Sequence, residues 1–188
     1  ADVLADGAKT VAYSYIGPEL TYPIYYDGSI GQAKQDLYRT ADKINEHIQG
    51  TEAYVAVNKA VVTQSSSAIP IVPLYISILF KVMKELNLHE GCIEQMYRLV
   101  HDRLCVEGGV PTDENHLIRM DDYEMKPEVQ EEVKKIWKKI SPENLSELTD
   151  IDGYWQEFYE IFGFRIEGVD YDADVNIQTS IPSIISAE

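Results

Sequence analysis

The sequence has few cysteines and few positive charges. It holds 2 cysteines, Cys92 and Cys105, and 16 lysine and arginine residues against 32 aspartate and glutamate residues, for a net charge of −16. Two cysteines do not make a disulfide framework, and Cys92, in an apolar helical pattern, is expected to be a buried free thiol in a reducing cytoplasm. The negative charge argues against nucleic-acid and anionic-membrane partners, because phosphate groups would be repelled.

Long apolar runs and a secretion signal are also missing. The most apolar run extends from Ala68 to Phe80 and contains Pro70 and Pro73. It is shorter than the roughly 20 residues that cross a bilayer. The first residues are polar and acidic, without a basic region before an apolar one. We therefore expect a cytoplasmic protein with no membrane partner, in which residues 68–80 are buried.

Metal-ligand spacings and a glycine-rich nucleotide turn are absent too. The histidines have no ligand spacing with cysteines or carboxylates, so no metal is expected. Asp170, Asp172 and Asp174 resemble the start of a calcium loop, but the later glycine and glutamate of that loop are missing, which predicts a solvated acidic turn. No Gly-x-Gly-x-x-Gly lies between a predicted strand and a helix.

What is present is the pattern of a predominantly helical α/β protein. Residues 10–15 and 53–62 have few charges and predict strands buried on both faces of a parallel sheet. Residues 107–121 predict a loop or a hairpin. Apolar residues recur every three or four positions in the remaining segments. Helices are therefore expected over residues 30–48, 73–86, 90–104, 126–140, 142–148 and 154–162.

Two details of these helices follow from the same pattern. Asp121, Asp122 and Glu124 precede the helix at 126–140, where the helix dipole favours carboxylates, so we expect caps rather than acid–base groups. The helix at 73–86 is apolar nearly all round, which suits a core helix or the wall of an acyl pocket. The expected apolar face of the helix at 90–104 consists of Ile93, Met96, Tyr97, Val100 and Leu104.

A phenol and an ammonium frame the stretch from Tyr25 to Lys34. Gly28 and Gly31 lie between them, and a helical pattern begins near Ile30, which puts Lys34 about one turn inside a helix. The phenol can supply a proton, while the ammonium lowers the phenol's pKa and holds a cofactor hydroxyl. The alternative is a half-buried aromatic beside a lysine that extends to solvent.

A polar turn follows the second predicted strand. Residues 63–67 carry small hydroxyl or amide side chains between that strand and the next helix. Open α/β sheets bind ligands at such turns, beyond the carboxyl ends of the strands. The alternative is an ordinary loop whose hydroxyls cap the helix.

Several stretches together resemble one enzyme family, the trans-2-enoyl-CoA reductases and FabV-type enoyl-acyl-carrier-protein reductases. They occur in the same order along nearly the whole chain. The stretches are Ser14–Pro18, Tyr22–Tyr25, Asp27–Lys34, Val57–Gln64, Ile69–Tyr75, His89–Gln95, Asp121–Glu124 and Gly168–Tyr171.

This resemblance implies that NADH reduces the C2–C3 double bond of an enoyl thioester carried by CoA or acyl-carrier protein. The family's proton donor falls on Tyr25, and its lysine, which also holds the nicotinamide ribose, falls on Lys34. Tyr15 matches the tyrosine that contacts the thioester carbonyl. The matching cofactor contacts are Val61, Val62 and Thr63. The negative charge weakly favours CoA over an acidic carrier protein.

The family is much longer than this chain, and its nucleotide-binding first half has no counterpart here. The resemblance therefore implies the C-terminal part of a Rossmann-like, short-chain-dehydrogenase-like fold, with the N-terminal half as partner. We expect one unit over residues 1–188, with the sheet edge, active-site loop and substrate helices in 1–90 and a helical part in 91–188. The alternative is a non-catalytic, mainly helical fragment that binds a partner or an acyl group.

Overall fold

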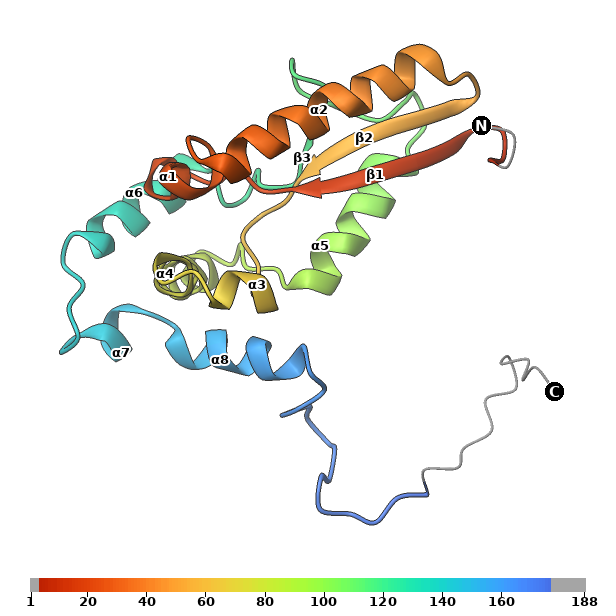
Figure 1. Cartoon of the computed structure of the whole chain (residues 1–188). Coiled ribbons are helices and arrows are strands. Elements are labelled where there is room, and N and C mark those ends of the chain that lie inside the picture. Colours follow the sequence, from red (N-terminus) through yellow and green to blue (C-terminus); the bar gives the residue numbers. More distant parts are fainter. Residues whose placement is uncertain (1–3, 177–188) are drawn as a thin grey trace.

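The structure is a computed structural model, and it describes residues 4–176. Its centre is a sheet of three parallel strands, β1 (Ala8–Ser14), β2 (Thr51–Val57) and β3 (Leu117–Arg119), in the order β1-β2-β3 (Figure 1). Ala8 pairs with Thr51 at one end of the β1–β2 ladder and Ser14 with Val57 at the other. Both strands therefore end together, as the parallel-sheet prediction requires.

Helices fill the connections between and after the strands. Between β1 and β2 lie the 3₁₀ turn η1 (Glu19–Thr21), α1 (Tyr22–Tyr25) and α2 (Ser29–His47). Between β2 and β3 lie α3 (Gln64–Ser67), α4 (Ile71–Glu85), α5 (Cys92–Leu99) and the π-helical turn η2 (Val100–Leu104). After β3 come α6 (Pro127–Trp137), α7 (Leu145–Leu148) and α8 (Ile151–Glu160). The mixed α/β class, its parallel strands and its helical excess are confirmed.

The two faces of the sheet carry different helices. On one face, Leu37, Tyr38 and Ala41 of α2 pack against apolar side chains of β2 and β3. On the other, Leu99 of α5 packs against Ala56 and its neighbours on β3. α2 and α5 thus lie on opposite sides of the strands (Figure 1).

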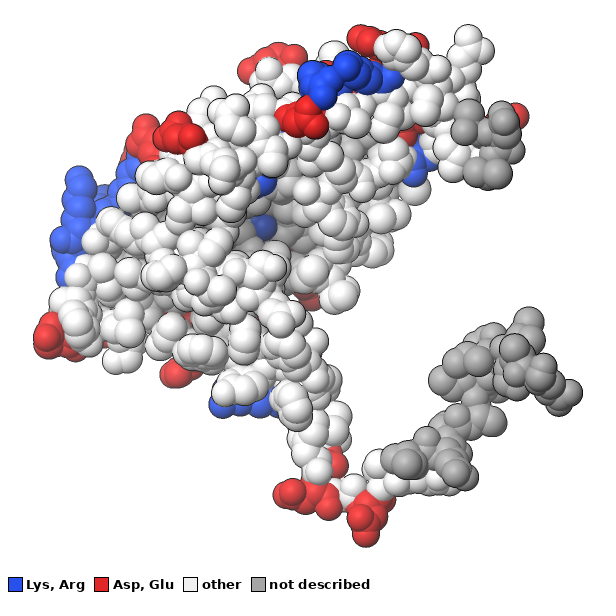
Figure 2. Space-filling model, in the orientation of Figure 1, with Lys and Arg blue, Asp and Glu red and all other residues white. Residues whose placement is uncertain are grey.

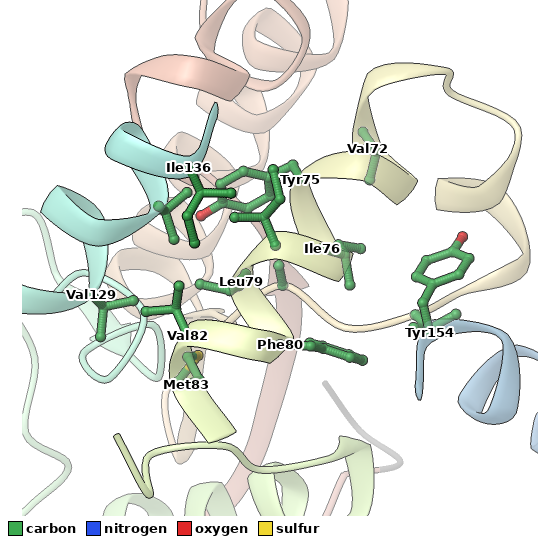
Figure 3. Packing of buried hydrophobic residues seen from close by; sticks show 14 residues of the cluster. Val72, Tyr75, Ile76, Leu79, Phe80, Val82, Met83, Val129, Ile136 and Tyr154 are labelled. Atoms are coloured by element: carbon green, nitrogen blue, oxygen red, sulfur yellow. The ribbon is translucent and has the colours of Figure 1, made fainter. Parts of the chain in front are cut away.

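The largest core forms around α4. Its side chains Ile78, Leu79 and Phe80 have no exposed surface, and α6 and α8 pack against the helix. Figure 3 shows Val129 and Ile136 of α6 on one side of α4 and Tyr154 of α8 on another. The all-round apolar pattern of this helix is thereby explained as core, while one flank remains available to line a cavity.

The apolar face predicted for the helix at 90–104 is right only in part, since Met96 and Leu104 pack against the core around Ala56. Ile93, Tyr97 and Val100 are 77, 66 and 52% exposed, whereas Gln95 and Arg98 are buried beside Leu99. Arg98 is turned inward because Glu90, Asp122 and the carbonyl of Met120 accept its hydrogen bonds. Gln95 is turned inward because its Oε1 accepts the Lys59 amide at 2.8 Å. An ionic anchor, together with the apolar contacts of Leu99, orients this helix.

Four other expectations need correction. Cys92 is exposed rather than buried, since it lies on the outward side of α5, and Cys105 is exposed as well. β1 is not buried on both faces, because Tyr13 is 61% exposed. The hairpin expected at 107–121 is absent, since this segment contains β3, which runs parallel to β2. β2 also ends at Val57, five residues before the predicted end, so Asn58–Val62 form a loop.

Beyond α8 the chain leaves the body of the molecule (Figure 1). Residues 165–176 form turns and bends, and the acidic turn at Asp170–Asp174 is exposed, as predicted. The tail from Asn176 to Glu188 has no strong sequence pattern, and all of it except Asn176 lies outside the described residues. Among residues 4–176, no helix is long and apolar enough to cross a membrane, and no cluster of three metal-binding side chains occurs.

Candidate active site

A cavity of about 370 Å³ lies where β1 and β2 end. Because parallel strands end at one edge, the loops after Ser14 and Val57 meet there. α1, the start of α2, α3 and one flank of α4 complete the wall. Residues of the wall that matter below are Tyr15, Tyr25, Lys34, Lys59, Thr63 and Tyr75.

Five of the six side chains predicted for the site line this cavity. Tyr15, Tyr25, Lys34, Val61 and Thr63 do so. Val62 does not. It is 6% exposed and packs into the core around α4, with its other side on a neighbouring depression. The structure therefore brings the phenol, the ammonium and the polar turn to one place.

Tyr25 presents a hydroxyl that no group within residues 4–176 hydrogen-bonds. The residue ends α1, a single helical turn before α2. Its ring stands edge-on to that of Tyr15, with centroids 4.9 Å apart. Burial raises the pKa of Tyr25 above its usual value, so the phenol keeps its proton at neutral pH. It is a free hydroxyl with a proton to donate.

The chain between the phenol and the ammonium depends on Gly31. A Cβ at Gly31 would lie 1.9 Å from the carbonyl oxygen of Tyr26. No side chain fits such a gap, so glycine allows the first turn of α2 to pass directly beneath the end of α1. This close approach brings Lys34, one turn further along, back toward Tyr25.

Lys34 contacts both tyrosines of the site. Its ammonium donates to the backbone carbonyl of Tyr15 and lies 4.8 Å from the centre of the Tyr25 ring. The lysine is half-buried, and this desolvation lowers its pKa from 10.5 to about 8. The ammonium lies over the face of the Tyr25 ring. The expected lowering of the Tyr25 pKa by Lys34 is therefore not observed, since burial raises that pKa instead.

Thr63 has two functions in the wall. Its Oγ1 accepts the Ser66 amide at 3.0 Å and its own amide donates to Ser66 Oγ, so it caps α3. The capping interpretation of the polar turn is thus confirmed. Thr63 nevertheless lines the cavity, and its hydroxyl proton has no acceptor within the described part of the chain. Capping fixes the side chain while leaving one donor for a ligand.

Glu124 is the residue that the sequence did not assign to the site. It has no exposed surface, and its Oε1 accepts the hydroxyls of Tyr15 at 2.9 Å and Tyr75 at 2.6 Å. Its Oε2 accepts the Ala60 amide at 2.7 Å. Burial, and then the charge of Glu124, raises the pKa of Tyr15 well above its usual value. Its place in the Asp121–Glu124 block was the one signal that could have found it.

The capping role expected for this acidic block is wrong. Asp121 binds Arg119, and Asp122 binds Arg98 and Arg103. The residue that caps α6 is Lys126, and no side chain hydrogen-bonds that end of the helix. Ion pairs hold Asp121 and Asp122, and hydrogen bonds hold Glu124, so none of these carboxylates caps the helix.

Lys59 is a second cation in the cavity wall. It is 1% exposed, and its Nζ donates to the carbonyl of Ala60 at 2.8 Å. Burial lowers the pKa of this lysine. Figure 2 shows this face as largely uncharged, with a hollow near its centre where lysine or arginine atoms are visible at the base. A strongly acidic chain thus keeps local positive charge at its cavity, which suits an anionic ligand.

Comparison with known proteins agrees with this geometry. Residues 1–105 match the family described as the trans-2-enoyl-CoA reductase catalytic region. The chain belongs to the trans-2-enoyl-CoA reductase family. A family member from Ruminiclostridium cellulolyticum, the NADH-type trans-2-enoyl-CoA reductase, is 55% identical over 98% of this chain and 47% of its own length. An NADH-type enoyl-acyl-carrier-protein reductase from Coxiella burnetii is 51% identical over 96% of this chain and 45% of its own length.

Solved structures of the family show the same fold. The trans-2-enoyl-CoA reductase of Clostridium acetobutulicum in complex with NAD has a TM-score of 0.88 at 47% identity, over 93% of this chain and 46% of that one. The trans-2-enoyl-CoA reductase of Treponema denticola in complex with NAD also has a TM-score of 0.88, at 46% identity. The match covers 92% of this chain and 44% of that one. The chain thus spans less than half the length of these relatives. The alternative of a non-catalytic fragment finds no support among them.

Residues 112–175 match a family segment described as an enoyl reductase FAD-binding domain. A FAD pyrophosphate requires a glycine-rich turn between a strand and a helix, or a cluster of cations. Here β3 is followed by residues 120–126, which contain no glycine, and no residue of 112–175 lines the cavity. The segment contributes no residue to the cavity described above, and we derive no step through FAD.

Proposed function

We propose that this chain supplies the proton donor and the acyl-binding wall of an NADH-dependent enoyl-thioester reductase in the cytoplasm. The observation that carries the proposal is the free hydroxyl of Tyr25, beside Lys34 and Thr63, in one cavity. The thioester is carried by CoA or by acyl-carrier protein, since relatives of both names match at similar identity.

The nicotinamide end of NADH suits the donors of the wall. Within residues 4–176, Lys34 has a single hydrogen bond, which leaves N–H groups for a ribose hydroxyl, and Thr63 has a hydroxyl proton without an acceptor. Val61 borders the same space. When bound, NADH supplies the hydride that adds to C3 of the enoyl thioester.

Hydride addition places negative charge on the thioester oxygen as an enolate, and C2 then needs a proton. Tyr25 donates its hydroxyl proton to C2, and solvent restores the phenol. The positive charge of Lys34, 4.8 Å from the ring centre, stabilises the phenolate that forms. A phenol of raised pKa is a reluctant acid in the resting site, so this charge matters most in the transition state.

The remaining half of the enzyme docks, in this proposal, on the open edge of β1 and on α5. Within residues 4–176, β1 pairs with β2 alone. Tyr13 on β1, Ile93 and Tyr97 on α5 and Val100 at the start of η2 expose apolar surface, and Figure 2 shows few charges on this face. A nucleotide-binding half that adds a parallel strand beside β1 would cover them and complete a Rossmann-like sheet.

The test is Tyr25→Phe in the full-length protein that carries this chain. Turnover of a short trans-2-enoyl-CoA with NADH should fall by a factor of about 10² or more, because the proton donor is lost. NADH affinity, measured by fluorescence titration, should stay within about twofold. Turnover that survives the substitution would assign the proton to another group.

A further inference from the structure

A buried carboxylate connects the cavity to a distant part of the chain. Glu124 lies between β3 and α6, yet its oxygens bind Tyr15 after β1, Tyr75 on α4 and the Ala60 amide after β2. Tyr15, Tyr75 and Ala60 all line the cavity. Glu124 itself does not line it. It acts on the site only through these neighbours.

The hydrogen bonds of Glu124 determine which phenol has a proton to donate. A tyrosine hydroxyl has a single proton, and those of Tyr15 and Tyr75 both point to Glu124 Oε1. Toward the cavity these two hydroxyls can therefore only accept. The hydroxyl of Tyr25 has no such acceptor within the described residues. The expected grip of Tyr15 on a thioester carbonyl would require it to release Glu124.

Tyr15 contacts both Tyr25 and Lys34, so its position affects theirs. Its ring supports Tyr25 edge-on at 4.9 Å, and its backbone carbonyl accepts the ammonium of Lys34. A Cβ at Gly17 would lie 2.5 Å from the Tyr15 hydroxyl, so the turn is shaped around that oxygen. Movement of Tyr15 would therefore shift both Tyr25 and Lys34.

The cost of burying the Glu124 carboxylate indicates a role beyond stability. Glu124 forms no ion pair with any residue of 4–176. Burial raises its pKa, and three hydrogen bonds and the nearby charge of Lys59 oppose that effect. Because burial penalises the charged form of a carboxylate, an apolar residue at this position would avoid the penalty. A group retained at such a cost has a role in the site.

We infer that Glu124 is a positioning residue of the reductase site. It fixes Tyr15 and Tyr75 as hydrogen-bond acceptors and leaves Tyr25 as the phenol that donates. The inference rests on the proposed function for its kinetic consequence. The hydrogen bonds of Tyr15 and Tyr75 to Glu124 are independent of it.

The kinetic test is a double-mutant cycle with Glu124→Gln and Tyr15→Phe in the full-length protein. Glu124→Gln keeps the volume but removes the charge that both phenols face, so kcat for a short trans-2-enoyl-CoA should fall about tenfold with the KM for NADH within about twofold. In the Tyr15→Phe background the same change should alter kcat by less than about twofold, because Glu124 acts through Tyr15. A full additional loss in that background, or an unchanged kcat, would overturn the inference.

A matched control and a spectroscopic readout separate this inference from the proposed function. Glu90→Gln removes another buried carboxylate, one that binds Arg98, and should lower the melting temperature while kcat is retained. Ultraviolet titration of the phenols should show Tyr15, which with Tyr75 and Lys59 faces Glu124, ionising at lower pH in Glu124→Gln. If the wild type fails to reduce enoyl thioesters, the proposed function fails, but an unchanged phenol titration alone would contradict the assignment of Glu124.

Discussion

The ammonium of Lys34 lies 4.8 Å from the centre of the Tyr25 ring and donates to the backbone carbonyl of Tyr15. The lysine is thus tied to the β1 end of the site while its charge faces the proposed proton donor. The half-buried position costs the ammonium part of its hydration, which is why its pKa falls to about 8. Two measurable pH effects follow.

The first effect is on cofactor binding. Above about pH 8 the ammonium of Lys34 loses its charge. We expect the NADH affinity of the full-length protein to weaken as the pH rises from 7.5 to 9.5. Lys34→Arg, which remains protonated, should shift this weakening to higher pH, and Lys34→Met should bind NADH weakly throughout. Parallel pH profiles for the wild type and Lys34→Met would exclude Lys34 as the titrating group.

The second effect is on stability and has the opposite sign. The folded pKa of Lys34 lies below the unfolded value of 10.5, so between about pH 8 and 10.5 the unfolded chain binds more protons. The contribution of Lys34 to the free energy of unfolding therefore rises with pH in that window. In denaturant unfolding, the free energy of unfolding of the wild type should rise relative to that of Lys34→Met between pH 8 and pH 10. A difference in unfolding free energy between the two proteins that does not change with pH would mean that Lys34 has the same pKa in the folded and the unfolded chain.

Gly31→Ala should disrupt the junction of α1 and α2. The added Cβ would meet the Tyr26 carbonyl, a backbone atom that cannot move without shifting α1. We expect a loss of about 2–4 kcal/mol in unfolding free energy, together with loss of the Tyr25–Lys34 geometry. Gln32→Ala, at the next and exposed position of α2, should change stability by less than about 0.5 kcal/mol. Equal melting temperatures for the two variants would refute the close-contact argument.

The buried ion pair of Arg98 should dominate the stability of α5. Arg98 is 8% exposed and binds both Glu90 and Asp122. Arg98→Ala leaves a buried carboxylate unpaired, so we expect a loss of about 3–5 kcal/mol by denaturant titration. Arg39→Ala removes an exposed pair with Asp36 and should cost less than about 1 kcal/mol. Similar losses in both variants would show that burial does not set the strength of these pairs.

The exposed apolar side of α5 should drive association of the isolated chain. Ile93 and Tyr97 lie one turn apart on that side and are mostly exposed. Ile93→Glu with Tyr97→Glu should abolish concentration-dependent association in sedimentation velocity, and in the full-length protein it should lower the melting temperature. Glu94→Gln, an exposed change on the same helix, is the control. Unchanged behaviour in both forms would place the contact with the other half elsewhere.

The sequence predicted those elements in which local pattern and burial agree. α4 is apolar all round and lies in the core, and α2 has its stripe against the sheet, so periodicity located both. The motif stretch around Tyr25 and Lys34 placed the cavity because its glycines encode a real close approach. In the Tyr25–Lys34 stretch the decisive contact, Gly31 against Tyr26, joins residues that are near in sequence.

The errors arose where partners distant in sequence decide the outcome. α5 turns its charged Arg98 inward toward Glu90 and Asp122, which helical periodicity cannot anticipate. β3 has only three residues, too few for an alternation to appear. Glu124 precedes a helix and so resembled a cap, while its real partners Tyr15 and Tyr75 lie 109 and 49 positions away.

The hydrogen bond from Tyr15 to Glu124 crosses the boundary between the two matched family segments, 1–105 and 112–175. Cutting or exchanging the protein between them would part a phenol from the group that orients its proton. Chimeras that join the first segment of one relative to the second of another should therefore work only when both sides of this bond are preserved. What looks like a domain border in the sequence is crossed, in the folded chain, by a hydrogen bond that holds a residue of the cavity wall.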